Sequence, residues 1–376
     1  MNKFKTIFHR SFLLFLVLLT NFCTQHIDAK RMSPLIWDMK SLENTKNNLQ
    51  SSGDAKVIVE LADQYCGETP ICIVNQRYLD YAPNEHYYCS MSPYIWPDSV
   101  NKGKYIVQDG KANPNYKFYD SEKLSNAARR CEILSKAFYF TRKKKYYTAF
   151  INQLRAWFLD DATYMLPNFE YAQVIPEYRD RNNSTGMIDA YFFNTIMESI
   201  RLVDAEKKIK RRTMKGLQKW FLTFADWSET MHGKYMREEG KQNISVAYDV
   251  TIVNMYLFAG KLEVAKSLAD GFAERRIFTQ IAEDGTQPEE LKRPNAFSYS
   301  IYNLTHFLDF CYLVRYWDND YYSKYGKRID EALSFLQRYI DTPESFSYPK
   351  ITDLNSAKKS LNELVMRRDV LGHAVQ

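Results

Sequence analysis

A helical spacing of apolar residues begins at about residue 121 and continues through most of the remaining chain. Apolar side chains recur every three or four positions, which places them on one face of an α-helix. The first segment carries this stripe at Leu124, Ala127, Cys131, Leu134 and Phe138. No alternating strand pattern of comparable length competes with it, so the sequence predicts an all-α fold.

The helical segments come in pairs joined by short links such as Gly260-Lys261, which is typical of helical hairpins. The later stripes are Tyr147, Phe150, Leu154 and Trp157; Ile188, Phe192, Ile196 and Val203; Met214, Leu217, Phe221 and Phe224; Val246, Val250, Val253 and Leu257; Leu262, Ala265, Ala269 and Phe272; and Ile329, Leu333, Leu336 and Ile340. Such hairpins can close into an (α/α) toroid or stack into an open solenoid. The spacing alone does not separate the two.

Residues 30–120 are less regular, with one predicted helix near Ala55–Tyr65 and two segments rich in Pro, Asn, Asp and aromatic residues. This composition indicates ordered loops. One loop carries Tyr94 and Trp96, whose rings could form the floor of a sugar-binding subsite or pack as ordinary loop aromatics.

The first residues are basic, an apolar run follows them, and small residues end at Ala29 in a plausible cleavage site. This order is typical of a secretory signal peptide. We therefore expect residues 1–29 to be removed and residues 30–376 to form a single domain that is secreted or periplasmic.

Composition limits the partners of the chain. A formal net charge of +6 is too modest to indicate nucleic-acid binding, and no later stretch is long and apolar enough for a membrane span. Abundant tyrosine and a mild positive charge suit an anionic, sugar-like ligand. The cysteines and histidines lack the paired spacing of a zinc site, so we expect no metal and no cofactor, while Cys66 and Cys72 could form a disulfide. The sequence leaves the oligomeric state open.

The segment from Gln280 to Leu304 concentrates groups that can do chemistry. Glu289 and Glu290 follow a turn, and Arg293 precedes a predicted helix that carries Tyr299 in its first turn. A guanidinium and a helix N-terminus both favour an ionised phenol, so Tyr299 could transfer protons. The alternative is that Arg293 pairs with a glutamate and Tyr299 is an ordinary wall residue.

The same predicted helix carries His306 two turns after Tyr299. This spacing puts Tyr299, Asn303, His306 and Phe310 on one face, which we expect to line a cavity. His306 is therefore a candidate for proton transfer, with His232, in a predicted loop, as the other. A structural role is the alternative for each.

The Gln280–Leu304 segment resembles the alginate-lyase-like family of uronate polysaccharide lyases, in which a Gly-x-Gln-Pro-x-Glu-Leu turn leads to an Arg and then to Tyr-Ser-x-x-Asn-Leu. The matching residues are Gly285, Gln287, Pro288, Glu290, Leu291, Arg293, Tyr299, Ser300, Asn303 and Leu304. The resemblance covers most of the chain from about Tyr87 to Asn303. It implies that the hairpins close into a toroid and that the substrate is an anionic polysaccharide.

Three further segments carry the resemblance, and the first supplies Ser92, Pro93, Tyr94, Trp96, Pro97, Asp109, Gly110, Asn113 and Pro114. In the loop after residue 160 it implies that Gln173 hydrogen-bonds a sugar, and Arg179 and Asn182 are candidates for binding carboxylates unless that loop is merely solvated. In the later segment, aligning on Tyr248 puts Asn243 on a family asparagine. As members of matched motifs, Tyr248 and Gln287 are also candidates for substrate binding.

The family typically has a histidine directly after that asparagine, whereas this chain has Ile244. The resemblance implies that Asn243, together with Arg293, binds the substrate carboxylate, and that Tyr299 is a general acid that also serves as base when the proton lies on its face. An N-cap is the structural alternative for Asn243. Ile244 cannot transfer a proton, so a base for the opposite face is missing.

Two rival functions remain open. A lyase scaffold that lost its base at Ile244 could bind uronans without cleaving them. A glycoside hydrolase on an α/α barrel could use two acids such as Glu290 and Asp189.

Overall fold

The apolar stripes form helices where the spacing predicts them, and the all-α prediction is confirmed. The structure is a computed structural model that describes residues 33–74, 82–175, 184–340, 342–349 and 353–372, all within one unit that spans residues 33–376. The predicted helices are α3 (Gly53–Cys66), α4 (Asp120–Thr141), α5 (Lys144–Phe158), α6 (Phe192–Glu206), α7 (Arg211–Ser228), α9 (Asn243–Phe258), α10 (Leu262–Ala269), α13 (Ala296–Val314) and α15 (Lys327–Ile340). The predicted signal segment lies outside the described residues.

Further elements have weaker sequence patterns. The additional α-helices are α2 (Met39–Asn47), α8 (Lys234–Glu238), α11 (Phe278–Gln280), α12 (Pro288–Leu291), α14 (Tyr321–Tyr325) and α16 (Leu354–Gly372). Short 3₁₀ segments are η1 (Pro114–Phe118), η3 (Ser184–Tyr191) and η6 (Pro343–Ser345), and the π-helical segments are η4 (Glu229–Gly233) and η5 (Ala273–Ile277). Helix α16 buries few apolar residues and packs on α13 and α15.

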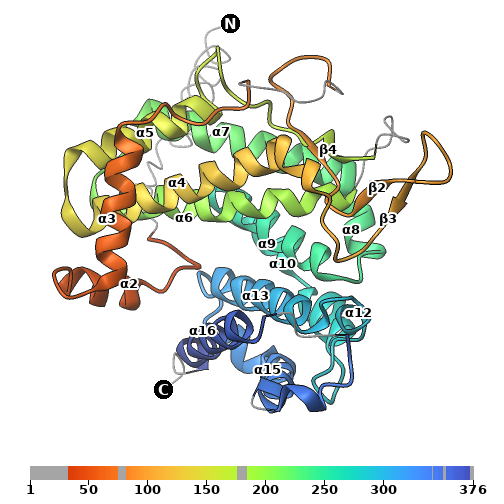
Figure 1. Cartoon of the computed structure of the whole chain (residues 1–376). Helices are drawn as coiled ribbons and strands as arrows, with labels where there is room; N and C mark the ends of the chain where they lie inside the picture. The colour runs from red at the N-terminus through yellow and green to blue at the C-terminus, as the bar shows by residue number, and fades with distance from the viewer. Residues whose placement is uncertain (1–32, 75–81, 176–183, 341, 350–352, 373–376) are drawn as a thin grey trace, which may run out of the picture. The chain divides into compact units, whose positions relative to one another are not determined.

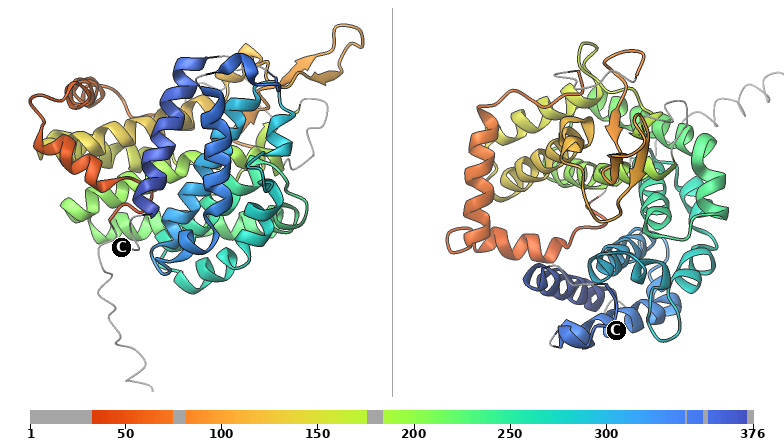
Figure 2. Two further views of the ribbon diagram at one scale, coloured as in Figure 1. Left: turned by 90° about the horizontal axis from the view of Figure 1, so that it is seen from below. Right: turned by 45° about the vertical axis from the view of Figure 1, so that its right-hand side comes forward.

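The helices form two layers around a centre. In the inner layer, α4 packs on α6, and α9 packs on both α6 and α13. In the outer layer, α5 packs on α4, α7 and α10 pack on α9, and α15 and α16 pack on α13. The right-hand view of Figure 2 shows these helices following one another around the centre, as in the predicted toroid.

Four short strands interrupt the helical pattern. β1 (Cys89–Met91) pairs in parallel with β4 (Tyr171–Val174), and β2 (Ile95–Pro97) pairs antiparallel with β3 (Tyr105–Val107). The β2–β3 hairpin projects from the helices (Figure 1). Strands of three or four residues are too short to show an alternating pattern, so the sequence did not predict them.

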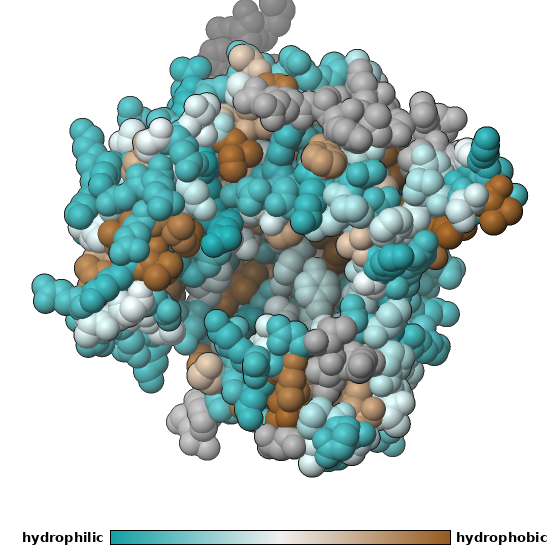
Figure 3. Space-filling model, viewed as in Figure 1, coloured by the Kyte–Doolittle hydropathy of each residue, from teal (hydrophilic) through white to brown (hydrophobic). Residues whose placement is uncertain are grey.

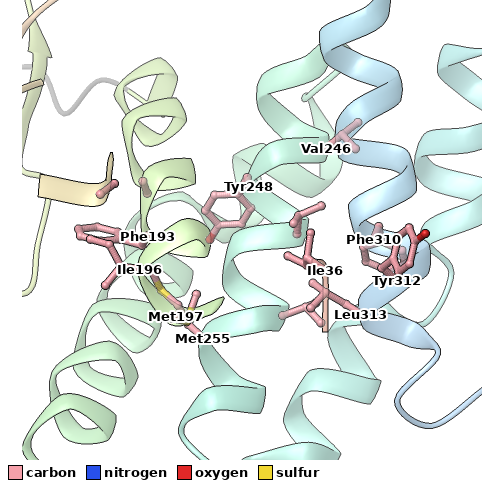
Figure 4. Packing of buried hydrophobic residues seen from close by; sticks show 14 of the residues in the cluster. Ile36, Phe193, Ile196, Met197, Val246, Tyr248, Met255, Phe310, Tyr312 and Leu313 are labelled. Atoms are coloured by element: carbon pink, nitrogen blue, oxygen red, sulfur yellow. The ribbon is translucent and has the colours of Figure 1, made fainter. Parts of the chain in front are cut away.

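The hydrophobic core connects distant parts of the chain. Its main cluster extends from Ile36 to Leu371, and Figure 4 shows members of it from Ile36 to Leu313. The backbone amides of Ile36 and Trp37 donate hydrogen bonds to buried Glu198 on α6, at 2.7 and 3.1 Å. Glu198 also pairs with buried Arg201 at 2.6 Å, so α6 fixes the segment that precedes α2.

The possible disulfide between Cys66 and Cys72 is not formed, because both are free thiols. The side-chain amide of Gln153 on α5 accepts a hydrogen bond from the Ile71 N–H at 2.9 Å and donates one to the Ile71 carbonyl at 2.8 Å. These bonds hold the backbone beside Cys72 against α5. In the described ranges, no helix has the length and apolar character needed to cross a membrane.

Candidate active site

Tyr299 lies in the first turn of α13, as predicted, and contacts two other residues of the candidate site. Its hydroxyl oxygen lies 2.5 Å from that of Tyr94, which immediately precedes β2. The guanidinium carbon of Arg293 lies 3.7 Å from the centroid of the Tyr299 ring. The loop before β2 and the turn before α13 therefore meet at one phenol.

Arg293 is held by Asp109, which follows β3. Its Nε and Nη2 atoms donate to the two carboxylate oxygens at 2.6 and 2.7 Å, and these hydrogen bonds lower the pKa of Asp109. Glu290 is farther away, at 4.0 Å from Nη1. Because Tyr94 precedes β2 and Asp109 follows β3, both ends of the β2–β3 hairpin are attached to the candidate site.

Arg293 favours the ionised form of Tyr299, as expected, but it does not determine the pKa of Tyr299 in the unliganded protein. Burial and the hydrogen bond with Tyr94 raise the pKa of Tyr299, and these effects outweigh the opposing charge of Arg293. The first turn of α13 is too weak an electrostatic source to reverse the desolvation cost. Tyr299 is therefore protonated at neutral pH.

Asn243 is bound by Glu290. Its backbone N–H donates to Glu290 Oε1 at 2.7 Å, and its side-chain Nδ2 lies 3.0 and 2.9 Å from the two carboxylate oxygens. Asn243 is the first residue of α9, and the N-cap position belongs to Gln242, so the structure does not support the N-cap alternative. Burial raises the pKa of Glu290, while the hydrogen bonds from Asn243 oppose that rise.

Gly285 and Gln287, which belong to the turn motif before α13, make contacts within the protein. Gln287 is 2% exposed, donates to the Ser300 carbonyl at 3.1 Å and accepts from Asn303 at 3.0 Å. Gly285 has φ +83°, and a Cβ there would lie 2.2 Å from the Glu331 carbonyl oxygen, so the turn requires glycine. The Gln287 side chain is therefore engaged within the protein in this conformation, and its expected contact with substrate stays a prediction.

Gln173 adopts a strained backbone conformation beside a buried carboxylate. Its φ is +48°, its N–H donates to Ser90 Oγ at 2.8 Å, and its side-chain Nε2 donates to Asp189 at 3.0 Å. Asp189 also accepts hydrogen bonds from Tyr88 and Ser90, at 2.8 and 2.7 Å, and burial raises its pKa. Strain of this kind in a non-glycine residue is common at functional sites.

Other predicted substrate contacts differ in accessibility. Tyr248 is 1% exposed and donates to Glu229 at 2.7 Å, and its expected substrate contact stays a prediction. Trp96 is partly exposed on β2; its indole N–H donates to the Lys111 carbonyl at 2.8 Å, and Lys111 Nζ lies 4.8 Å from the ring centroid. Arg179 and Asn182 lie outside the described residues.

The expectation that His306 lines a cavity is wrong. The imidazole is fully buried, with ring centroids 4.2 Å from Tyr191 and 4.3 Å from Tyr302, and burial lowers its pKa to about 3. The partly exposed residues of this part of α13 are Tyr299, Tyr302 and Thr305. The helix therefore turns a different face to the interior, a rotation that spacing within one helix cannot reveal.

His232 is also buried, in the π-helical segment η4 rather than in a loop. Its Nδ1 lies 3.0 Å from Ser184 Oγ, and burial lowers its pKa to about 4. Ile244 packs against the hydrophobic core. The structure thus brings Tyr299, Tyr94, Arg293, Asp109, Asn243 and Glu290 together as a set of contacts and leaves both histidines in the interior.

The hydrolase alternative lacks an accessible acid pair. Glu290 and Asp189 are 1% and 7% exposed, and each carboxylate is occupied by hydrogen bonds within the protein. A hydrolase needs its two carboxyl groups free to reach a water molecule and a glycosidic oxygen. This arrangement does not favour hydrolysis.

A cavity of about 780 Å³ lies apart from Tyr299, between α10, η5 and α14. Its lining includes the carboxylates of Glu263, Asp270, Glu274 and Asp318, which would repel a polyanion. By contrast, the surface is hollowed between α4 and α13 (Figure 3), and α13 is the helix that carries Tyr299.

Two residues near Tyr299 were not singled out as candidates from the sequence. Asp109 lies in one of the loop segments predicted before residue 120, and its partner Arg293 is 184 positions away. Tyr302 follows Tyr299 by three positions, which places both on one side of α13, and this spacing was the available signal for it.

Comparison with known proteins places these observations in a family. The family model described as Alginate lyase matches residues 73–346. The crystal structure of an alginate lyase from Bacteroides ovatus is 30% identical and has a TM-score of 0.84, over 91% of this chain and 93% of that one. An alginate lyase from Sphingomonas species A1 is 15% identical, with a TM-score of 0.46 over 93% of this chain and 84% of that one. Comparison with curated proteins gives no match. The chain belongs to the alginate lyase family and is a polysaccharide lyase.

Proposed function

We propose that this protein cleaves a uronate-containing polysaccharide by β-elimination, with Tyr299 as the residue that transfers protons. The observation that carries the proposal is the contact of the Tyr299 phenol with both Tyr94 and Arg293. The family match and the similarity to the alginate lyase from Bacteroides ovatus support the substrate class.

The reaction needs three groups. A base takes the proton from C5 of the uronate, the electron pair of that bond forms the C4–C5 double bond, and the C4–oxygen bond breaks. An acid then gives a proton to the departing oxygen. The carboxylate on C5 must meanwhile be stabilised, because negative charge spreads onto it as the C5 proton leaves.

Asn243 is suited to that stabilisation. Its Nδ2 lies nearly equidistant from the two oxygens of Glu290, so one amide hydrogen points between them. The second hydrogen is then directed away from Glu290 and can be donated to a substrate carboxylate. Arg293 adds positive charge, and its bidentate bond to Asp109 fixes its position.

Tyr299 suits the acid role because its raised pKa keeps it protonated at neutral pH. To serve as base it must first lose that proton, and the positive charge of Arg293 lowers the cost of doing so. One phenol can then take the C5 proton and return a proton to the leaving oxygen if both lie on the same face of the sugar.

The replacement of histidine by Ile244 sets an expectation about the substrate. Without a base on the opposite face, the enzyme should prefer mannuronan or glucuronan, in which the C5 proton and the C4 oxygen share a face, to guluronan. The non-catalytic uronan-binding alternative rests on the same replacement, whereas the family match supports a lyase. We also propose that the mature protein acts after export.

The test is a screen of the mature protein against mannuronan, glucuronan, guluronan and a neutral polysaccharide, followed by the ultraviolet absorbance of the unsaturated product. The expected result is product from at least one same-face uronan and a lower initial rate on guluronan. Binding without product would favour the non-catalytic function. An equal or higher rate on guluronan would show that another residue provides the opposite-face base.

A further inference from the structure

Tyr302 lies on the same side of α13 as Tyr299, three residues further along the helix. The partly exposed residues of this stretch, Tyr299, Tyr302 and Thr305, are spaced by three positions and so lie along one side of the helix. Each step of three residues advances about 4.5 Å along the helix axis. This advance is close to the length of one sugar ring, so the two tyrosines suit neighbouring units of a polymer.

The ring of Tyr302 is held in place by aromatic packing. It meets His306 edge to face, with ring centroids 4.3 Å apart and an interplanar angle of 73°, and His306 meets Tyr191 in the same way at 4.2 Å. The Tyr191 hydroxyl donates to Asp309, which also accepts from Arg367 on α16. Buried His306 therefore lies between the rings of Tyr191 and Tyr302. The hydrogen bonds of Asp309 with Tyr191 and Arg367 connect these three rings to α16.

The hydroxyl groups of Tyr191 and Tyr302 differ in their hydrogen bonding. That of Tyr191 is occupied by Asp309, whereas that of Tyr302 makes no hydrogen bond to any residue in the described ranges. A largely enclosed tyrosine usually finds a hydrogen-bond partner for its hydroxyl. A fixed ring with an unused donor on the exposed side of α13 is therefore prepared for a ligand.

The charges around Tyr302 indicate which ligand atom it meets. Burial and the carboxylates of Asp189, Asp309 and Glu290 raise its pKa, as does neighbouring Tyr94, so the phenol is a neutral donor. The carboxylates of Asp189 and Asp309 oppose the approach of a further anion to Tyr302. A sugar hydroxyl is a better match for this donor than a sugar carboxylate.

We propose that the Tyr302 hydroxyl donates a hydrogen bond to a hydroxyl of the sugar unit next to the one held at Tyr299. This inference rests on the proposed function and adds a residue that selects the substrate at the adjoining subsite. Tyr302 contacts substrate but transfers no proton in the reaction.

The test compares two hydroxyl deletions in a Tyr299→Phe background, in which the substrate is not consumed. Tyr302→Phe removes the proposed donor. Tyr325→Phe is the matched control, because Tyr325 is a partly exposed tyrosine of α14 whose ring packs on Tyr321. Titration with a mannuronate or glucuronate trisaccharide measures the dissociation constant of each protein, and thermal unfolding verifies that each is folded.

The expected result is a dissociation constant raised about 3- to 10-fold by Tyr302→Phe, the effect of one neutral hydrogen bond, and unchanged by Tyr325→Phe. An unchanged constant for Tyr302→Phe would overturn the inference, and so would the absence of trisaccharide binding by the background protein. The product assay on the wild type tests the proposed function separately. If the wild type binds the trisaccharide but forms no unsaturated product, the proposed elimination is wrong. The comparison of Tyr302→Phe with Tyr325→Phe still tests the contact of Tyr302 with the sugar.

Discussion

The hydroxyl oxygens of Tyr94 and Tyr299 lie 2.5 Å apart although the two residues are separated by 205 positions in the chain. This contact joins the loop before β2 to the first turn of α13. It also links the protonation of Tyr299 to a residue on a different element, because the hydrogen bond with Tyr94 raises the pKa of Tyr299.

Tyr94→Phe should move the rising limb of the pH–rate profile on a same-face uronan to lower pH. In the proposed mechanism Tyr299 must lose its proton before it can act as base, so activity rises as the pH rises through the pKa of Tyr299. Removing a group that raises this pKa lowers it and brings the rise to a lower pH. Initial rates between neutral and alkaline pH check this expectation. If the limb stays at the same pH, or moves to higher pH, Tyr94 does not raise the pKa of the titrating group.

Asp109→Asn should reduce kcat about tenfold with little loss of stability, because Arg293 loses the carboxylate that fixes it over Tyr299. The matched control is Asp98→Asn on the same hairpin, where the carboxylate accepts hydrogen bonds from its own turn, at Val100 and Asn101, and from no other part of the described chain. Steady-state kinetics of both variants provide the measurement. Equal rates for the two would mean that the Asp109–Arg293 pair has no part in turnover.

Glu290→Gln should make stability less dependent on pH. The pKa of Glu290 is raised by burial, so the folded state holds a proton that the unfolded state has lost once the pH exceeds about 4.5. Stability then falls as the pH rises through that window, and neutral Gln removes this cost. Thermal midpoints of wild type and variant should therefore differ less at pH 4 than at pH 7. A constant difference would rule out titration of Glu290 as the cause.

Export should remove residues 1–29, because the basic start, the apolar run and the small residues up to Ala29 have the order of a signal peptide. Mass spectrometry of protein recovered from the producing cell and its medium would locate the N-terminus. An intact first residue on protein confined to the cytoplasmic fraction contradicts this prediction.

Sequence periodicity predicted the long helices because a buried stripe of apolar residues specifies a helix locally. It missed α16, whose buried positions are sparse, and the strands, which are too short to show alternation. It also placed Tyr299 correctly in the first turn of α13. The rotation of that helix depends on how α13 packs against α9 and α16, and for this reason His306 was placed on the wrong face.

The partners of the site residues were harder to predict than the residues. Arg293 and Tyr299 are near in sequence, so their stacking could be anticipated from spacing. Asp109 and Glu290 reach their partners across 184 and 47 positions. Such contacts depend on the tertiary arrangement of the helices, which local sequence patterns do not specify.

Tyr299→Phe is the most direct test of the proposed mechanism. Phe keeps the ring that Arg293 covers at 3.7 Å and removes only the hydroxyl, so the fold and most of the substrate affinity should persist. Loss of a positioned general acid typically lowers the rate by about 10²–10⁴-fold. The measurement is the initial rate of unsaturated product from a same-face uronan, together with the dissociation constant of a trisaccharide for both proteins. The account predicts a rate lowered at least about 100-fold at nearly unchanged affinity, whereas a variant that forms unsaturated product at close to the wild-type rate would contradict it.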